Sequence, residues 1–172
     1  ETGESLRRVV HSDPGDIEAR IRLAPILHSQ GKVTEALELL LAAINIGPRL
    51  SRETESNSTL RADAARLSGE IRLVEKQFSA AERDFETSLR IHETAAAHAN
   101  LARIYGARGD FKSAAEQLRH AKRLQNSVIE WRLLLAEAFA RGRQLEQAIR
   151  ELEQTIIAFS TDARPNIMLG QV

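Results

Sequence analysis

The segment AAAHANLARIYGARGDFKSAAEQLRHAKRLQ, residues 95–125, contains two helical patterns joined by a Gly-Asp turn at residues 109–110. Apolar residues recur at spacings of three and four on both sides of this turn, which predicts two amphipathic helices. Two helices joined by so short a turn must lie antiparallel, and neither can bury its apolar stripe alone. The segment therefore predicts one helical hairpin that needs a neighbour.

The same hairpin pattern occurs four times along the chain of 172 residues. An alanine stands early in the second helix of each hairpin, at Ala36, Ala81, Ala114 and Ala148, with spacings of 45, 33 and 34 residues. The last two spacings indicate a repeat of about 34 residues, and the first indicates the same repeat with an insertion of about 11. A period of this size predicts a helical solenoid, in which each unit is stacked on its neighbours.

Small and large residues also recur at fixed places in the predicted pairs. A small residue stands on each first helix, where it lets the two helices approach closely, at Ala24, Gly69, Ala102 and Ala136. A large apolar or aromatic residue follows three positions later in every unit except the second, where Arg72 takes its place. We expect looser packing in the second unit for this reason.

These motifs resemble tetratricopeptide repeats, whose 34-residue pattern has Leu-Gly, Tyr, Ala-Phe-Ala and Pro in a fixed order. Four dipeptides stand for its Leu-Gly pair, Leu23-Ala24, Ser68-Gly69, Leu101-Ala102 and Leu135-Ala136. The pattern is weaker at Arg72 and where Pro is missing after repeats two to four. The resemblance covers nearly the whole chain and implies an all-α fold, a right-handed superhelical α-solenoid of antiparallel helix pairs.

The repeat period predicts a division of the chain into consecutive segments. These are the tail of a preceding repeat (1–14), repeat one (15–48), an inserted loop (49–61), repeat two (62–94), repeat three (95–128), repeat four (129–162) and the start of a truncated further repeat (163–172). Because both ends fall within a repeat, we expect the chain to be a piece of a longer superhelix. The insertion is polar and without helical period, which predicts a loop. Pro25 lies within the first predicted helix and predicts a kink or a break there.

Composition excludes several classes of function. The 24 basic and 24 acidic residues give a formal charge of zero, whereas nucleic-acid binders usually have a basic excess or a basic face. The densest basic run, Arg119, His120, Lys122 and Arg123, is better explained as a solvated helix face than as a phosphate site. The absence of cysteine excludes thiolate metal sites and disulfides. No apolar run approaches the length of a membrane helix.

No set of residues predicts catalysis or a cofactor. The sequence has no Gly-rich phosphate loop, no GxSxG and no HExxH motif. The five histidines form no pair with metal-ligand spacing, although His92 and His98 straddle a helix boundary. We therefore expect surface histidines, no metal and no enzyme activity.

The resemblance implies that the first helix of each unit lines a concave groove. The polar residues at its exposed positions are the candidate partner-binding residues: Arg66, Glu70, Asn100, Arg103, Glu130, Glu137 and Arg141. The competing interpretation is a self-neutralised ladder, because Glu70, Arg103 and Glu137 occupy one position in successive repeats. A clamp for a C-terminal carboxylate, known from some tetratricopeptide domains, is not expected, since Glu70 and Glu137 would repel that group.

The sequence therefore predicts a non-catalytic scaffold that binds a protein or peptide in its groove, without nucleic-acid binding or membrane insertion. One alternative is an accessory region of an enzyme or export machine, such as a glycosyltransferase or polysaccharide-secretion protein, that positions substrate or subunits. The second alternative is self-association. The compartment stays open, since the family favours the cytoplasm, whereas a vector-derived origin of residues 1–3 would indicate a luminal, extracellular or periplasmic chain.

Overall fold

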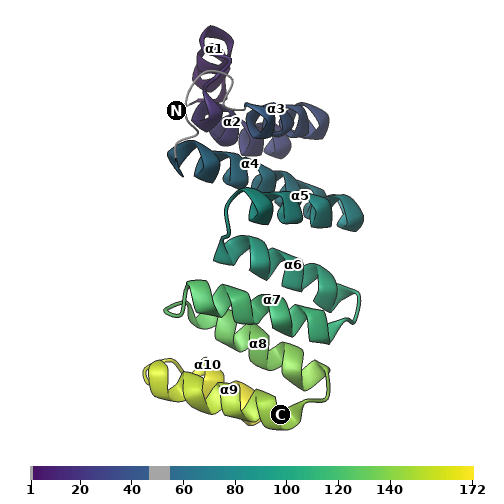
Figure 1. Ribbon diagram of the computed structural model, residues 1–172, viewed down its shortest axis with the longest axis vertical. Helices are drawn as coiled ribbons and strands as arrows, with labels where there is room; N and C mark the ends of the chain where they lie inside the picture. Colours follow the sequence, from purple (N-terminus) through teal and green to yellow (C-terminus); the bar gives the residue numbers. More distant parts are fainter. Residues whose placement is uncertain (1, 47–54) are drawn as a thin grey trace. The chain divides into compact units, whose positions relative to one another are not determined.

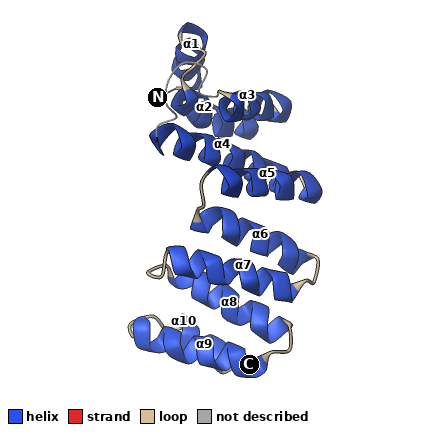
Figure 2. Cartoon of the chain, viewed as in Figure 1, coloured by secondary structure: helices blue, strands red, loops and turns tan. Residues whose placement is uncertain are grey.

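The computed structural model describes residues 2–46 and 55–172. Over these residues the regular secondary structure is helical, with no strand (Figures 1 and 2). The chain forms two compact units, Glu1–Glu93 and Thr94–Val172. None of the helices in the described part of the chain is long and apolar enough to cross a membrane.

The described residues of the first unit form five helices that pack on their neighbours in sequence. They are α1 (Gly3–Ser12), α2 (Ile17–Ser29), α3 (Val33–Asn45), α4 (Glu55–Val74) and α5 (Phe78–Ile91). Helix α2 packs on α1, α3 and α4, and α4 also packs on α3 and α5. Leu23, Leu27 and Leu40 are buried at the centre of the resulting core. Each apolar stripe is thus covered by an adjacent helix of the same unit.

The ends of α2 follow directly from the sequence. The side chain of Asp16 accepts a hydrogen bond of 2.8 Å from the backbone N–H of Ala19 and so caps the first turn. Gly31 follows the helix with a φ of 77°, a conformation that glycine adopts without strain. The helix runs through Pro25 without a break, and Pro25 is exposed, so its ring meets solvent rather than a neighbouring helix.

The inserted loop predicted for residues 49–61 is wrong from Glu55 onward, because α4 begins there. Residues 49–54 lie outside the described residues. The hydroxyls of Ser58 and Thr59 donate to the carbonyl of Glu55, each at 2.9 Å, so these polar side chains bond within the helix. Arg61 Nε donates to the carbonyl of Ile44 at 2.9 Å and ties α4 to the end of α3. Helix α4 thus begins earlier than hydrophobic periodicity alone predicts, and the extended part contacts a distant segment of the chain.

The α4–α5 pair is closely packed at its centre. Gly69 faces the ring of fully buried Phe85, and an added Cβ would lie 2.7 Å from Phe85 Cε1. Arg72, which replaces the usual large residue, forms an ion pair with Asp84 at 2.9 Å. Ser68 Oγ donates to the same carboxylate at 2.6 Å. Polar contacts of Arg72 therefore replace the apolar contact that the other units make at this position. The looser packing that we expected at this pair is not found around Gly69.

The second unit also contains five helices. They are α6 (Ala95–Ala107), α7 (Phe111–Leu124), α8 (Ile129–Arg141), α9 (Leu145–Ala158) and α10 (Arg164–Leu169). Successive helices pack on each other from α6 to α10. Leu118, Leu135 and Phe139 are buried in the core, together with the predicted small residues Ala102 and Ala114. Within each unit the fold is that of an all-helical repeat protein of the solenoid type.

The turns between paired helices share one backbone conformation. The residue with positive φ is Gly31, Lys76, Gly109 or Arg143 in the four hairpins, with φ between 60° and 81°. Two of these four positions carry a side chain, although the left-handed region disfavours residues with a Cβ. Lys76 and Arg143 therefore hold local backbone strain, because the geometry of the hairpin requires this conformation whatever the residue.

Candidate partner-binding groove

A cavity of about 300 Å³ lies in the second unit and is lined by residues of α6, α7 and α8. We call it the α6–α8 groove. Its floor is made of buried apolar side chains, Ala102, Ala114, Leu118, Ala138 and the half-buried Leu134. The exposed residues at its edge include Arg103, Ala107, Glu137 and Arg141. An apolar floor with a few polar groups at the edge is typical of a ligand site.

The charged groups at the edge are held by contacts within their own helices and, for Arg141, also by a contact with α7. Arg141 Nη1 lies 3.3 Å from Glu137 Oε1, one turn earlier on α8. The Arg141 guanidinium also lies 4.9 Å from the centre of the Phe111 ring, a cation–π contact. Arg103 Nη1 donates to Asn100 Oδ1 at 3.4 Å. Two arginines and one glutamate therefore give the edge a net positive charge, which favours an acidic group on a ligand.

Three of the seven predicted residues line this groove, namely Arg103, Glu137 and Arg141. Glu130, on α8 of the same unit, instead accepts a hydrogen bond of 3.1 Å from Arg164 Nη1 at the start of α10. Asn100 was expected at an exposed position, and that expectation is wrong, since only 8% of its surface is exposed. The reason is that residues 97–102 are all buried, so α6 is covered on every side over this stretch.

Arg66 and Glu70, the two remaining predicted residues, lie on α4 in the first unit. Arg66 Nη1 contacts Glu70 Oε1 at 2.7 Å, and Arg66 Nε lies 3.3 Å from Asp63 Oδ1. Both residues are half-buried. The ion pairs of Arg66 and Arg141 lie along a helix, between residues three or four apart, in α4 and in α8. The ladder between successive repeats stays a prediction.

The apolar side chains of the groove were not predicted as site residues. Phe111 and Leu134 are two of these side chains. The shape of the floor depends on how the side chains of three helices pack and where they leave a space. Hydrophobic periodicity predicts which residues are buried, but it does not predict such a space. The position of Phe111 directly after the Gly109-Asp110 turn was the available signal, because the first residue of α7 lies beside the last turn of α6.

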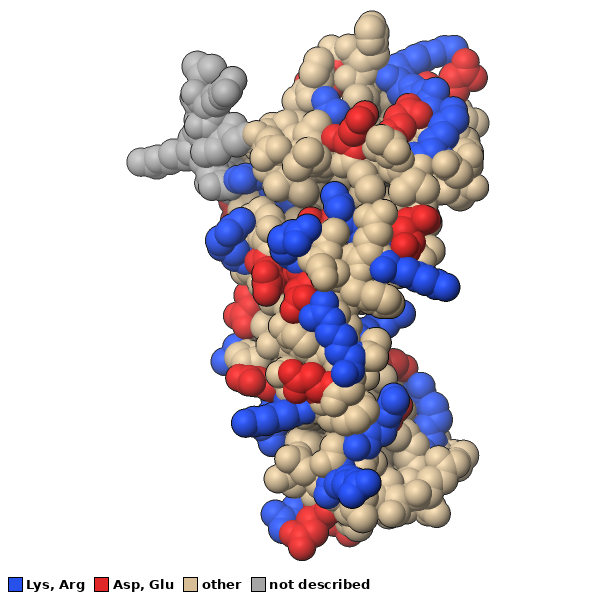
Figure 3. Space-filling model, turned by 90° about the vertical axis from the view of Figure 1, so that its right-hand side faces the viewer, with Lys and Arg blue, Asp and Glu red and all other residues tan. Residues whose placement is uncertain are grey.

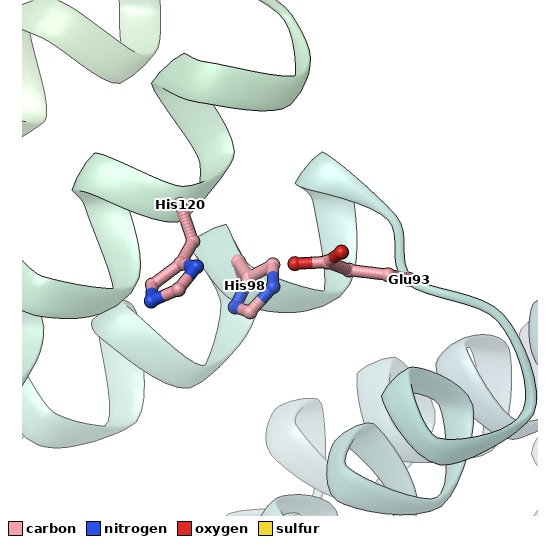
Figure 4. A group of neighbouring side chains, drawn as sticks. All are labelled: Glu93, His98 and His120. Carbon is pink, nitrogen blue, oxygen red and sulfur yellow. The ribbon is translucent and has the colours of Figure 1, made fainter.

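A pair of histidines forms another polar cluster within the second unit (Figure 4). The rings of His98 on α6 and His120 on α7 are stacked, with centroids 4.8 Å apart and planes 15° apart. His98 is buried, against the expectation of surface histidines, and its Nδ1–H donates to Gln117 Oε1 at 2.7 Å. Glu93, the third residue labelled in Figure 4, belongs to the first unit.

Basic and acidic side chains are mixed on the surface. On the face drawn in Figure 3, Lys and Arg lie among Asp and Glu, and no large area carries a single sign. This agrees with the formal charge of zero.

Two protein-family models, each described as tetratricopeptide repeat, match the chain over residues 1–61 and 94–129. Together they cover more than half of it. Among curated protein sequences, none matches significantly.

Solved structures with the same fold are numerous, at low sequence identity. BtubC (BKLC) from P. vanneervenii is 18% identical and aligns over 98% of this chain and 78% of its own, with a TM-score of 0.78. MamA is 16% identical over 94% of this chain and 89% of its own, with a TM-score of 0.74. YrrB, described as a TPR protein with an unusual peptide-binding site, is 20% identical over 95% of this chain and 79% of its own, with a TM-score of 0.72. At these identities the likeness shows the fold.

Proposed function

Because the chain belongs to the tetratricopeptide repeat family, we propose that it is a non-catalytic scaffold whose second unit binds a protein or peptide partner in the α6–α8 groove. The family supports a role in protein–protein interaction in general. The observation that carries the specific proposal is the groove itself, a 300 Å³ cavity with an apolar floor and a charged edge. YrrB, with a similar fold, is described as having a peptide-binding site.

The chemistry of the groove defines the kind of segment that fits. Ala102, Leu134 and Ala138 offer apolar contacts to a small or medium apolar side chain of the partner. The guanidinium groups of Arg103 and Arg141 offer charge-assisted hydrogen bonds to a carboxylate beside it. An extended segment with an acidic residue next to an apolar residue satisfies both requirements.

Selection of random peptides displayed on phage against the purified chain supplies a ligand without knowledge of the natural partner. We expect the selected peptides to contain an acidic residue next to an apolar one. Their affinity is then measured by fluorescence anisotropy for the chain, for Arg103→Glu and for the control Arg150→Glu. Arg150 is an exposed arginine on α9 that does not line the groove.

Arg103→Glu should weaken binding at least tenfold, because a repulsive charge replaces a donor at the edge of the groove. Arg150→Glu should bind as the unchanged chain does, since it makes the same charge change outside the groove. Equal affinity of Arg103→Glu and the unchanged chain would contradict the proposal and favour binding elsewhere.

A further inference from the structure

A second cavity in the second unit, of about 310 Å³, is lined by Arg119, Lys122, Arg123 and Asn126. We call it the α7 basic pocket. The first three residues project from α7 at spacings of three and four, so the helix brings them to one side. Asn126 follows just after the C-cap residue Gln125. All four lining residues offer hydrogen-bond donors, and none of them is a carboxylate.

The wall of this pocket is held by a buried ion-pair network. Lys122 Nζ contacts both carboxylate oxygens of Glu151 on α9, at 2.7 and 2.8 Å. Arg132 on α8 lies 3.7 Å from the same carboxylate and donates a hydrogen bond to Asn126 Oδ1. The side chains of Glu151 and Arg132 are each only 9% exposed. The donors Lys122 and Asn126 are therefore fixed in place by partners behind them.

Cations outnumber carboxylates among the residues that line the α7 basic pocket and the network behind them. The residues named above include four cations, Arg119, Lys122, Arg123 and Arg132, and a single carboxylate, Glu151. Arg132 Nε is buried and has no hydrogen-bond partner among the described residues. Because Arg132 Nη2 bonds the oxygen of the Asn126 amide, the NH₂ end of that amide faces away from Arg132. The excess charge and the donors together suit an anion with several acceptor oxygens.

The helix dipole acts in the opposite direction. The C-terminus of α7 carries a partial negative charge, which attracts the side chains of Lys122 and Arg123 and repels an anion. This effect is worth a fraction of one elementary charge, whereas the side chains named above carry an excess of three. The charges of the named side chains therefore outweigh the effect of the helix dipole.

We propose that the α7 basic pocket binds a phosphate monoester carried by a protein partner, such as a phosphorylated serine. A phosphate monoester has close to two negative charges at pH 7 and three acceptor oxygens, which match the donors of two arginines, a lysine and an amide. The pocket is a single site on one helix rather than a track, which favours one phosphate on a protein over the repeated phosphates of a nucleic acid. The proposal is independent of the α6–α8 groove.

A titration of the whole chain with the N-acetyl amide of phosphoserine, followed by ¹⁵N–¹H NMR at constant ionic strength and pH 7.5, tests the proposal. The matched ligands are the N-acetyl amide of serine, inorganic phosphate and a short single-stranded oligodeoxynucleotide. We expect saturable shifts confined to the amides around residues 119–126 with phosphoserine and with inorganic phosphate, and none with serine.

The variant Arg119→Gln/Arg123→Gln should weaken phosphoserine binding about tenfold, which corresponds to about 1.4 kcal/mol. Both residues are exposed, and neither is needed by the buried network, so the fold is expected to survive. The control Arg108→Gln/Arg150→Gln removes two exposed arginines of the same unit that do not line the pocket, and it should bind normally.

Each remaining outcome overturns the proposal. Equal weakening in both double variants would mean that only net charge matters. The absence of saturation, or shifts spread over the second unit, would mean that no site exists. Tighter binding of the oligonucleotide than of phosphoserine would assign the pocket to nucleic acid instead.

Discussion

Replacing Gly69 by alanine tests the close approach of α4 and α5. An alanine in place of glycine in a helix interior ordinarily stabilises a protein by about 1 kcal/mol. Here the new Cβ would lie 2.7 Å from Phe85 Cε1 and 2.9 Å from Phe85 Cδ1 and Cζ. Phe85 is fully buried, so its ring cannot move into solvent to relieve the clash. Overpacking of this kind costs about 1–3 kcal/mol, and contact with three ring atoms at once places it near the upper end.

The expected result for Gly69→Ala is therefore a net loss of about 2 kcal/mol in the free energy of unfolding. Urea denaturation followed by circular dichroism measures this loss. Gly106→Ala is the matched control, because nothing lies within 4 Å of its added Cβ. It should leave the chain unchanged or stabilise it by up to about 1 kcal/mol.

A double-mutant cycle with Phe85→Leu separates the clash from other effects. Leucine lacks the ring atoms that meet the new Cβ, so Gly69→Ala should cost less in the Phe85→Leu background than in the original chain. Two results would show that α4 and α5 are not in the close contact described above. One is a Gly69→Ala variant as stable as Gly106→Ala, and the other is additive effects of Gly69→Ala and Phe85→Leu on the free energy of unfolding.

Three further predictions concern stability. Lys76→Gly and Arg143→Gly should each stabilise the chain by about 1 kcal/mol in thermal unfolding, because glycine adopts positive φ without a Cβ clash, and a loss would contradict the strain assigned to these turns. Glu151→Ala should lower the free energy of urea unfolding by about 3 kcal/mol, since it leaves buried cations unpaired, and a neutral effect would show that the network is solvated. Hydrogen bonds from Ser113 hold the pKa of Asp110 below its ordinary value of 3.8, so this contribution to stability is present above pH 3.8 and is lost as the pH falls below it. Asp110→Asn should therefore flatten the pH dependence of the melting temperature below pH 4, and an unchanged slope would refute the assignment.

The sequence predicted the helix pairs well because their packing is local. The alanine period placed Ala81, Ala114 and Ala148 on the buried side of the first turns of α5, α7 and α9, where each is at most 2% exposed. It did not predict that α4 begins at Glu55, since that extension depends on a hydrogen bond from Arg61 to the distant Ile44 carbonyl. Periodicity reports which face of a helix is apolar, but it does not report contacts made by a polar face.

The candidate site was predicted in part. Arg103, Glu137 and Arg141 follow from their place in the repeat, and they do line the α6–α8 groove. Asn100 occupies an equivalent place and is buried, because the neighbours of α6 cover it more fully than the repeat pattern implies. The α7 basic pocket was not predicted, because the basic run alone favoured a solvated helix face over a phosphate site. Its shape depends on Asn126 and on the buried network behind Lys122. These contacts join residues that are distant in sequence.

Hydrogen–deuterium exchange of the chain with and without a selected peptide tests the central claim most directly. If the partner occupies the α6–α8 groove, amides in α6 and α8 near Arg103 and Glu137 should exchange more slowly in the complex. Those of α9, which contributes no residue to the groove, should be unchanged. Protection confined to α9, or to the first unit, would contradict the account.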